Sequence, residues 1–170
     1  MAIKKHKELS SLVGDDLHVT GGGTGLSSSI YSLQPADLRK PPSEIFTPLL
    51  ESGILSPTLP TLFLAECVFV YLSPTVSSSL INYFTTTFST NGCAGLVYEM
   101  FGLGTKFGKV MRDNLLARGI ELLGAEEANA LESQTRRFEE AGMGSAKSLT
   151  LKSVRKEYIE DKELKRSGVF

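Results

Sequence analysis

Three carboxylates of this sequence each follow a short apolar segment that is typical of a β-strand. They are Asp37, Glu66 and Glu99, and the segments before them are residues 30–33, 61–65 and 94–98. A carboxylate held away from water costs several kcal/mol unless a partner or solvent reaches it. Each acid therefore needs either an open position at the end of its strand or a group that donates hydrogen bonds to it. Cations, amines and exocyclic NH groups are such donors.

The elements around these acids predict how they are positioned. Residues 61–65 are apolar without alternation, which is typical of a parallel strand covered on both faces. Ser73 as N-cap and Pro74 at the first helical position predict a helix to about Phe88. Alternating strands and helices predict an α/β protein with an open parallel sheet, in which ligands bind outside the carboxyl ends of the strands. We therefore expect the three acids to line one edge of the sheet, with Glu66 at the mouth of its strand.

The remaining segments predict further elements of one 170-residue domain. Helices are expected at residues 3–13, 107–120 and 127–141, and a short one begins after Thr47 with Pro48 as its first residue. A weak strand is expected at residues 149–151. The Gly- and Ser-rich segment 21–29 indicates a flexible surface loop rather than a phosphate site, because no buried strand precedes it and no helix follows. Residues 152–170 are expected to form a poorly defined tail.

Composition narrows the class of function. The chain has 18 basic and 19 acidic residues, so its net charge of -1 gives no basic field for nucleic acid or anionic membranes. The two cysteines, Cys67 and Cys93, favour a reduced state. The longest apolar run is shorter than the roughly 20 residues that span a bilayer. We expect a cytoplasmic monomer that handles a small ligand.

The ligand chemistry follows from what the sequence lacks. His6 and His18 are the only histidines, and neither lies near the three acids in sequence. This disfavours a metal site and a nucleophile activated by a histidine base. A sulfonium cofactor that carries an adenine and an ammonium group would supply donors for all three carboxylates.

An ordered series of motifs over residues 30–145 closely resembles the leucine carboxyl methyltransferase family. The motifs read YSLQPADLR, LPTLFLAECVFVYLSP, LVYEMFGLGTKFGKVMRDNLLARG and LESQTRRFEEAG. The resemblance implies a class I, Rossmann-like methyltransferase fold that uses S-adenosyl-L-methionine. It also implies methylation of the C-terminal leucine carboxylate of the protein phosphatase 2A catalytic subunit. A leucine carboxylate is already ionised at neutral pH, so the transfer needs alignment rather than a base, and no catalytic residue is assigned.

The resemblance assigns roles to matching positions. Asp37 and Leu38 correspond to the pair that meets the adenine, and Glu66 corresponds to the glutamate beside the methionine part of the cofactor. Tyr71 and Tyr98 are similar to tyrosines near the substrate pocket, although tyrosines at strand ends also commonly border a core. These five residues are the predicted site.

Two adjacent arginines have two readings. Arg136 and Arg137 could attract an acidic peptide terminus by bidentate pairing. Ion pairs on the surface of their helix are the favoured interpretation.

Departures from the family pattern keep other functions open. The family's early strands with their Gly-rich cofactor turn are not found here, nor are its closing strands, so we expect a partial domain truncated at both ends. Such a chain on its own is expected to bind the cofactor weakly or not at all. The alternatives are a non-catalytic remnant that binds the phosphatase through residues 107–141, a relative of the wybutosine-forming tRNA carboxyl methyltransferases, and a methyltransferase acting on a small carboxylate. The neutral charge disfavours the tRNA substrate.

Overall fold

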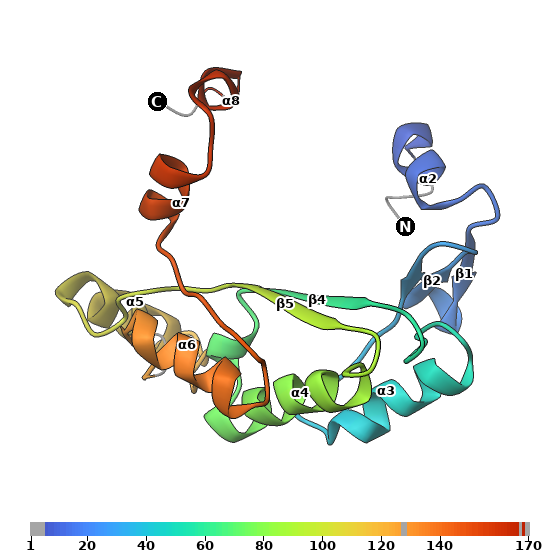
Figure 1. The fold of residues 1–170 in the computed structure, drawn as a ribbon, viewed down its shortest axis with the longest axis horizontal. Helices are drawn as coiled ribbons and strands as arrows, with labels where there is room; N and C mark the ends of the chain where they lie inside the picture. The colour runs from blue at the N-terminus through green and yellow to red at the C-terminus, as the bar shows by residue number, and fades with distance from the viewer. Residues whose placement is uncertain (1–5, 127–128, 167, 169–170) are drawn as a thin grey trace. The chain divides into compact units, whose positions relative to one another are not determined.

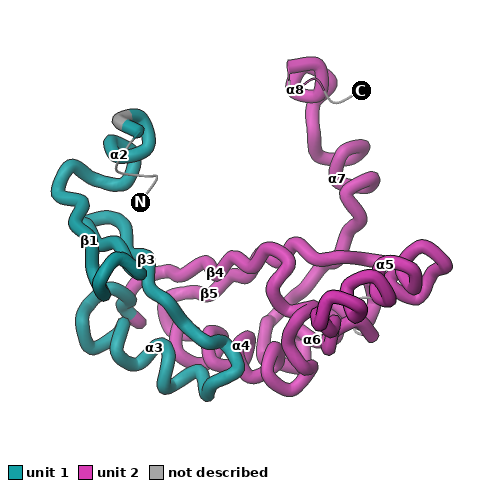
Figure 2. Tube along the Cα trace, turned by 180° about the vertical axis from the view of Figure 1, so that it is seen from behind, with its two compact units in different colours: residues 1–56 teal, residues 57–170 magenta. Residues whose placement is uncertain are grey.

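The computed structural model describes residues 6–126, 129–166 and 168. Within it the chain divides into two compact units, residues 1–56 and residues 57–170 (Figure 2). The expectation that residues 1–170 form one domain stays a prediction.

Among its described residues, from 6 to 56, the first unit combines a small antiparallel sheet with the α-helices α2 and α3 (Figure 1). Its sheet has the strand order β1-β2-β3, and both pairs are antiparallel. Its elements are α2 (Lys7–Val13), β1 (His18–Thr20), η1 (Gly21–Gly23), β2 (Gly25–Ser27), β3 (Ser32–Leu33) and α3 (Pro42–Glu51). The strand expected at residues 30–33 is therefore present as β3, but it pairs with β2 in an antiparallel hairpin. Its expected place in a parallel sheet is wrong.

The local sequence signals predict the end of α2 in this unit but not the start of α3. Helix α2 ends at Gly14, which has φ 105, as expected for a glycine that closes a helix. The start predicted at residue 3 lies outside the described residues. Helix α3 begins at Pro42 and carries Pro48 in its interior, so the predicted start after Thr47 is wrong.

The segment 21–29 was expected to be a loop. It contains the single turn η1 and the strand β2, which pairs with β1 from Thr20↔Gly25 to His18↔Ser27. The three consecutive glycines supply the positive φ angles of the connection between the strands. The segment is thus part of a hairpin.

The second unit is built on two parallel strands joined by a helix (Figure 1). Strands β4 and β5 pair from Thr61↔Cys93 to Glu66↔Tyr98. The elements are β4 (Thr61–Glu66), η2 (Phe69–Tyr71), α4 (Pro74–Thr87), β5 (Cys93–Tyr98), α5 (Lys106–Leu116), α6 (Leu131–Glu140), α7 (Leu151–Glu157) and α8 (Asp161–Arg166). This β4-α4-β5 order confirms the expected alternation of strand and helix.

Aromatic packing covers one face of this sheet. The Phe63 ring stacks on Phe84 of α4 at 5.0 Å and on Phe138 of α6 at 6.5 Å between centroids. Phe88 is fully buried beneath Phe84. Opposite Phe63 in the register stands Gly95, and the ring occupies the space that a side chain there would need.

The opposite face of the sheet is bare. Leu62, Leu64 and Leu96 are 64%, 67% and 59% exposed. Residues 61–65 were predicted to be covered on both faces, and that prediction is wrong for the described structure. Alternation along β4 is present in burial although the residue types do not alternate.

A second apolar cluster supports η2 and α5. Val70, Leu103, Leu122 and Ala125 are buried together, and Met111 and Leu115 of α5 pack against them. The N-cap of α5 is Thr105, whose hydroxyl accepts the Gly108 N–H.

The C-terminal segment is helical where the structure describes it. The weak strand predicted at residues 149–151 is wrong, because Thr150 accepts the Ser153 N–H as the N-cap of α7 and the helix begins at Leu151. The tail predicted as poorly defined from residue 152 contains most of α7 and all of α8.

Candidate functional site

Glu66 is the last residue of β4 and is exposed. It pairs in register with Tyr98, the last residue of β5. Because the two strands are parallel, both residues stand at the carboxyl edge of the sheet, where α/β proteins bind ligands. The predicted position of Glu66, at the mouth of its strand and outside the core, is confirmed.

Directly after Glu66 the chain makes a sharp turn. Cys67 has φ 50, which is unusual for a residue other than glycine. Its backbone N–H donates to the Tyr98 carbonyl at 2.8 Å, which extends the pairing of the strands by one residue. Burial, followed by the nearby carboxylates of Glu99 and Glu66, raises the pKa of the Cys67 thiol. The thiol therefore stays protonated at neutral pH and is a poor nucleophile.

Glu99 follows β5, but its carboxylate faces the turn after Glu66. Its Oε1 accepts the backbone N–H groups of Val68 at 3.1 Å, Phe69 at 2.6 Å and Val70 at 3.4 Å. The expected rim of three similar acids is thus wrong for Glu99, because this side chain bonds to its own protein.

Asp37 and Leu38 lie in the loop between β3 and α3, in the other compact unit. The Arg39 guanidinium pairs with both oxygens of Asp37, at 2.8 Å and 2.7 Å, and the Arg39 N–H adds a third bond at 3.1 Å. These hydrogen bonds lower the pKa of Asp37 to about 2. Leu38 is half-buried. Asp37 is ionised at neutral pH, and its place beside Glu66 stays a prediction.

A cavity of about 520 Å³ adjoins the carboxyl end of β5. Tyr98 and Glu99 contribute to its wall, together with Gln134 and Phe138 of α6 and Lys147 of the segment before α7. Sequence reasoning did not single out Gln134 and Phe138, although they lie within the motif LESQTRRFEEAG, nor Lys147, which follows that motif. Tyr71, in η2, is partly exposed and does not line this cavity.

Arg137 departs from the surface role favoured for it. The residue is 6% exposed, and its guanidinium lies over the rings of Phe69 at 5.2 Å and Phe138 at 5.5 Å. It also donates to Gln134 at 2.8 Å. Arg136 is exposed. The phenylalanine that directly follows Arg137 in TRRF was the available signal for a stacked arginine.

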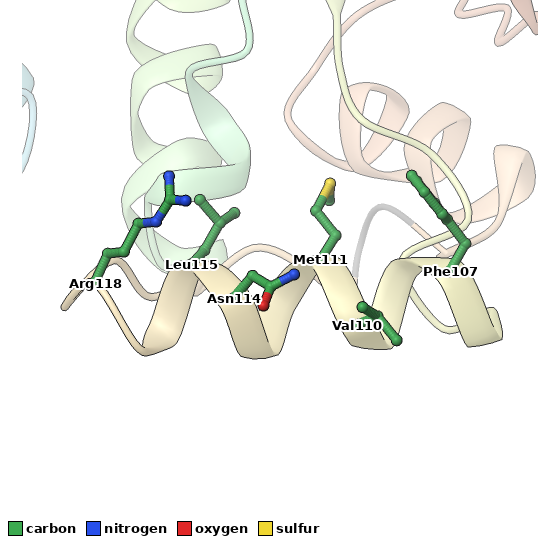
Figure 3. Close-up of a pocket in the computed structure, with 6 residues that line it drawn as sticks. All are labelled: Phe107, Val110, Met111, Asn114, Leu115 and Arg118. Atoms are coloured by element: carbon green, nitrogen blue, oxygen red, sulfur yellow. The ribbon is translucent and has the colours of Figure 1, made fainter.

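Helix α5 carries an apolar stripe beside a second cavity of about 280 Å³ (Figure 3). Phe107 and Val110 are exposed, whereas Met111 and Leu115 reach the core cluster. The lining residues are Phe107, Val110, Met111, Asn114, Leu115 and Arg118. Their spacing of three and four residues places them along one side of the helix.

Two absences hold for the described part of the chain. There, no three His, Cys, Asp or Glu side chains gather closely enough to hold a metal ion. Likewise, none of the helices described in residues 6–126 and 129–166 is long and apolar enough to cross a membrane.

The two predicted cofactor carboxylates lie in different units, and each can be assessed by itself as a hydrogen-bond acceptor. Glu66 offers an exposed carboxylate at the ligand-binding edge of the sheet. The Asp37 carboxylate keeps acceptor capacity beyond its bonds to Arg39, since two oxygens provide about four lone-pair sites. The fit is better for Glu66, because a ligand at Asp37 shares the carboxylate with an arginine.

Comparison with known proteins relates the chain to one family of enzymes. Residues 20–85 match the family model described as leucine carboxyl methyltransferase. The proteins named leucine carboxyl methyltransferase 1 from Cryptococcus neoformans, Schizosaccharomyces pombe and Bos taurus are 42%, 33% and 34% identical to it. The alignments cover 90%, 97% and 78% of this chain but 45%, 51% and 39% of those proteins. The chain thus spans about half the length, or less, of these curated relatives.

Proposed function

We propose that this chain, which is similar to the leucine carboxyl methyltransferase family, takes part in methylating the C-terminal leucine carboxylate of a protein. A methyltransferase needs a methyl donor, and the proposed donor is S-adenosyl-L-methionine. The proposed substrate is the protein phosphatase 2A catalytic subunit, and the proposed compartment is the cytoplasm. The observation that carries the proposal is the exposed Glu66 carboxylate at the carboxyl end of β4, within the segment that matches the family.

The fold proposed for this function is the class I methyltransferase arrangement. Its support here is the parallel β4-α4-β5 unit, which places Glu66 and Tyr98 side by side at the ligand-binding edge. The antiparallel pairing of β3 belongs to the other compact unit and lends no support.

The residues have separate proposed tasks. Glu66 would accept hydrogen bonds from the ammonium group of the cofactor. Asp37 would accept from the exocyclic amine of the adenine, and Leu38 would pack on the ring. Tyr71 and Tyr98 are proposed to border the substrate side. When bound, the cofactor would supply an electrophilic methyl group.

The substrate needs no base from the protein. A C-terminal carboxyl group has a pKa near 3.3–3.7 in peptides and is ionised at neutral pH. The contribution of this chain would therefore be to orient the carboxylate and exclude water.

The direct test is calorimetric titration of the folded 170-residue chain with S-adenosyl-L-methionine. Removing the Glu66 carboxylate should weaken binding about tenfold or more, because hydrogen bonds to charged groups contribute about 1.5–3 kcal/mol. The variant is Glu66→Ala, and the matched control is Glu121→Ala, which removes an exposed carboxylate outside the site. Circular dichroism checks that each variant folds.

Two results would count against the proposal. One is equal weakening by Glu66→Ala and Glu121→Ala. The other is no binding by the folded wild-type chain, which would mean that the family name describes ancestry and not the chemistry of this chain.

A second candidate function is partner binding without catalysis. The exposed apolar stripe of α5, which includes Phe107 and Val110, favours it (Figure 3). The proposed partner is again the phosphatase catalytic subunit. A chain that binds this subunit in a pull-down but gives no heat with the cofactor would support the second function over the first.

A further inference from the structure

The turn after Glu66 adopts a conformation that needs external support. Cys67 has φ 50, and a non-glycine residue in this region costs of order 1–3 kcal/mol and persists only where its surroundings impose it. Glu66 and Cys67 share a peptide bond. The Cys67 N–H bond to the Tyr98 carbonyl keeps that peptide in the ladder, so if Cys67 relaxed to a negative φ the turn would swing relative to β4 and change the space beside the Glu66 side chain. The orientation of Glu66 therefore depends on what holds the turn.

Three sets of contacts hold it. The Cys67 N–H donates to the Tyr98 carbonyl, and the Gly124 N–H donates to the Val70 carbonyl at 2.9 Å. Both of these bonds join backbone to backbone. The third set is the carboxylate of Glu99, which accepts the three N–H groups of Val68, Phe69 and Val70. Among these hydrogen bonds those of Glu99 come from a side chain, and the Arg137 guanidinium also lies over the ring of Phe69 in the same turn.

The Glu99 contacts are also the strongest kind available. Successive backbone N–H groups that converge on one point form a concave site for an anion. Hydrogen bonds to an ionised acceptor are shorter and about twice as strong as neutral ones, and the Phe69 bond is 2.6 Å long. Val70 and Phe69 are buried, so these N–H groups have little water to replace the carboxylate.

We propose that Glu99 is a positioning residue that holds the turn following β4 and thereby orients Glu66. The consequence for cofactor affinity rests on the function proposed above. Glu99 acts through Glu66 and does not touch the cofactor. Two acids that follow neighbouring strands thus have different tasks.

Glutamine is the conservative replacement for Glu99. Its Oε2 is buried without a hydrogen-bond partner in the described structure. Glu99→Gln keeps a carbonyl oxygen for the three N–H groups, while it removes the charge and replaces the buried Oε2 with an NH2 group. Glu99→Ala removes the acceptor altogether. The glutamine variant should therefore rescue most of what the alanine variant loses.

The first measurement uses the cofactor-free chain. Amide hydrogen exchange at Val68, Phe69 and Val70 should be at least about tenfold faster in Glu99→Ala and within about threefold of wild type in Glu99→Gln. Amides in the middle of α4, such as those of Leu80 and Ile81, serve as the control for global unfolding. Unchanged exchange at the turn in Glu99→Ala would overturn the inference, whether or not the chain binds cofactor.

The second measurement tests whether Glu99 acts through Glu66. S-adenosyl-L-methionine is titrated into wild type, Glu66→Ala, Glu99→Ala and the double variant. If Glu99 works through Glu66, the double variant should bind within about twofold of Glu66→Ala. If the affinity losses of the two single variants multiply in the double variant, Glu99 acts on the cofactor independently of Glu66. That result would also overturn the inference.

The two failures can be distinguished. A wild-type chain that gives no binding heat contradicts the proposed function of this chain. The positioning role is then decided by hydrogen exchange alone. A chain that binds cofactor but shows no change in exchange at the turn keeps the proposed function and loses the positioning role.

Discussion

At the scale of single residues, the state of Asp37 is set by its neighbour Arg39. The carboxylate forms a bidentate pair with the guanidinium two residues later, and this pair lowers its pKa from 3.8 to about 2. Because the pKa of the folded state is depressed, the stabilisation is fully present above about pH 4. It is lost as the pH falls through about 2. Since the Arg39 side chain is largely exposed and the Asp37 side chain is partly exposed, the effect on overall stability is expected to be small.

The resulting prediction concerns the titration of Asp37 itself. Arg39→Ala should raise its pKa towards 3.8, because both the hydrogen bonds and the charge are removed. Carboxyl-carbon NMR across pH 1.5–5.5, roughly two pH units around these values, measures the midpoint. Lys40→Ala is the matched control, because Lys40 is the smallest of the causes of the shift. Equal shifts in the two variants would contradict a specific pair with Arg39.

At the scale of elements, the close approach of β4 and α4 to β5 depends on Gly95. A Cβ at this position would lie 2.3 Å from the Phe63 ring, closer than any real contact. Phe63 is also stacked between α4 and α6, so the ring has little freedom to move away. The glycine is therefore required by packing, not by its backbone angles.

Gly95→Ala is expected to destabilise the protein by about 1–3 kcal/mol, the usual cost of adding volume to a packed core. Urea unfolding followed by circular dichroism measures the loss. The control is Gly144→Ala, since a Cβ there meets nothing within 4 Å, and it should stay within about 0.5 kcal/mol of wild type. A neutral Gly95→Ala would show that the Phe63 ring can rearrange.

At the scale of the whole molecule, the bare face of the β4–β5 sheet governs solution behaviour. Leu62, Leu64 and Leu96 form an exposed apolar surface on a two-stranded parallel sheet. Parallel sheets are normally covered on both faces, and exposed apolar patches promote association. The isolated chain should therefore bind hydrophobic dyes and self-associate, which differs from the monomer expected from the sequence.

Replacing one leucine on this face of the sheet should reduce both the dye binding and the self-association. Leu64→Gln is expected to lower dye fluorescence and to shift sedimentation towards the monomer, because it divides the apolar surface. Leu12→Gln, at an exposed leucine of α2, is the control for the general loss of a surface leucine. If both variants behave alike, the sheet face is not the cause of association.

Several features of this protein could be predicted from the sequence because short-range chemistry determines them. Ser73 and Pro74 mark the start of α4, and Gly142, with φ 92, follows the end of α6. Each of these residues lies within one helical turn of the helix end that it determines. The strand-helix-strand order and the position of Glu66 followed from the same local patterns. The quoted motifs also predicted the similarity to the leucine carboxyl methyltransferase family, which the comparison with known proteins confirmed.

Only the tertiary structure decided what each element packs against. The partner of β3, the bare face of β4 and the burial of Arg137 depend on contacts between residues far apart in sequence. Glu66 and Glu99 follow similar strands, and local sequence assigns them the same role. They differ because the N–H groups of the turn after β4 lie beside the end of β5, 29 to 31 residues along the chain from Glu99. One carboxylate is thereby left for solvent or a ligand, and the other is bound by its own backbone.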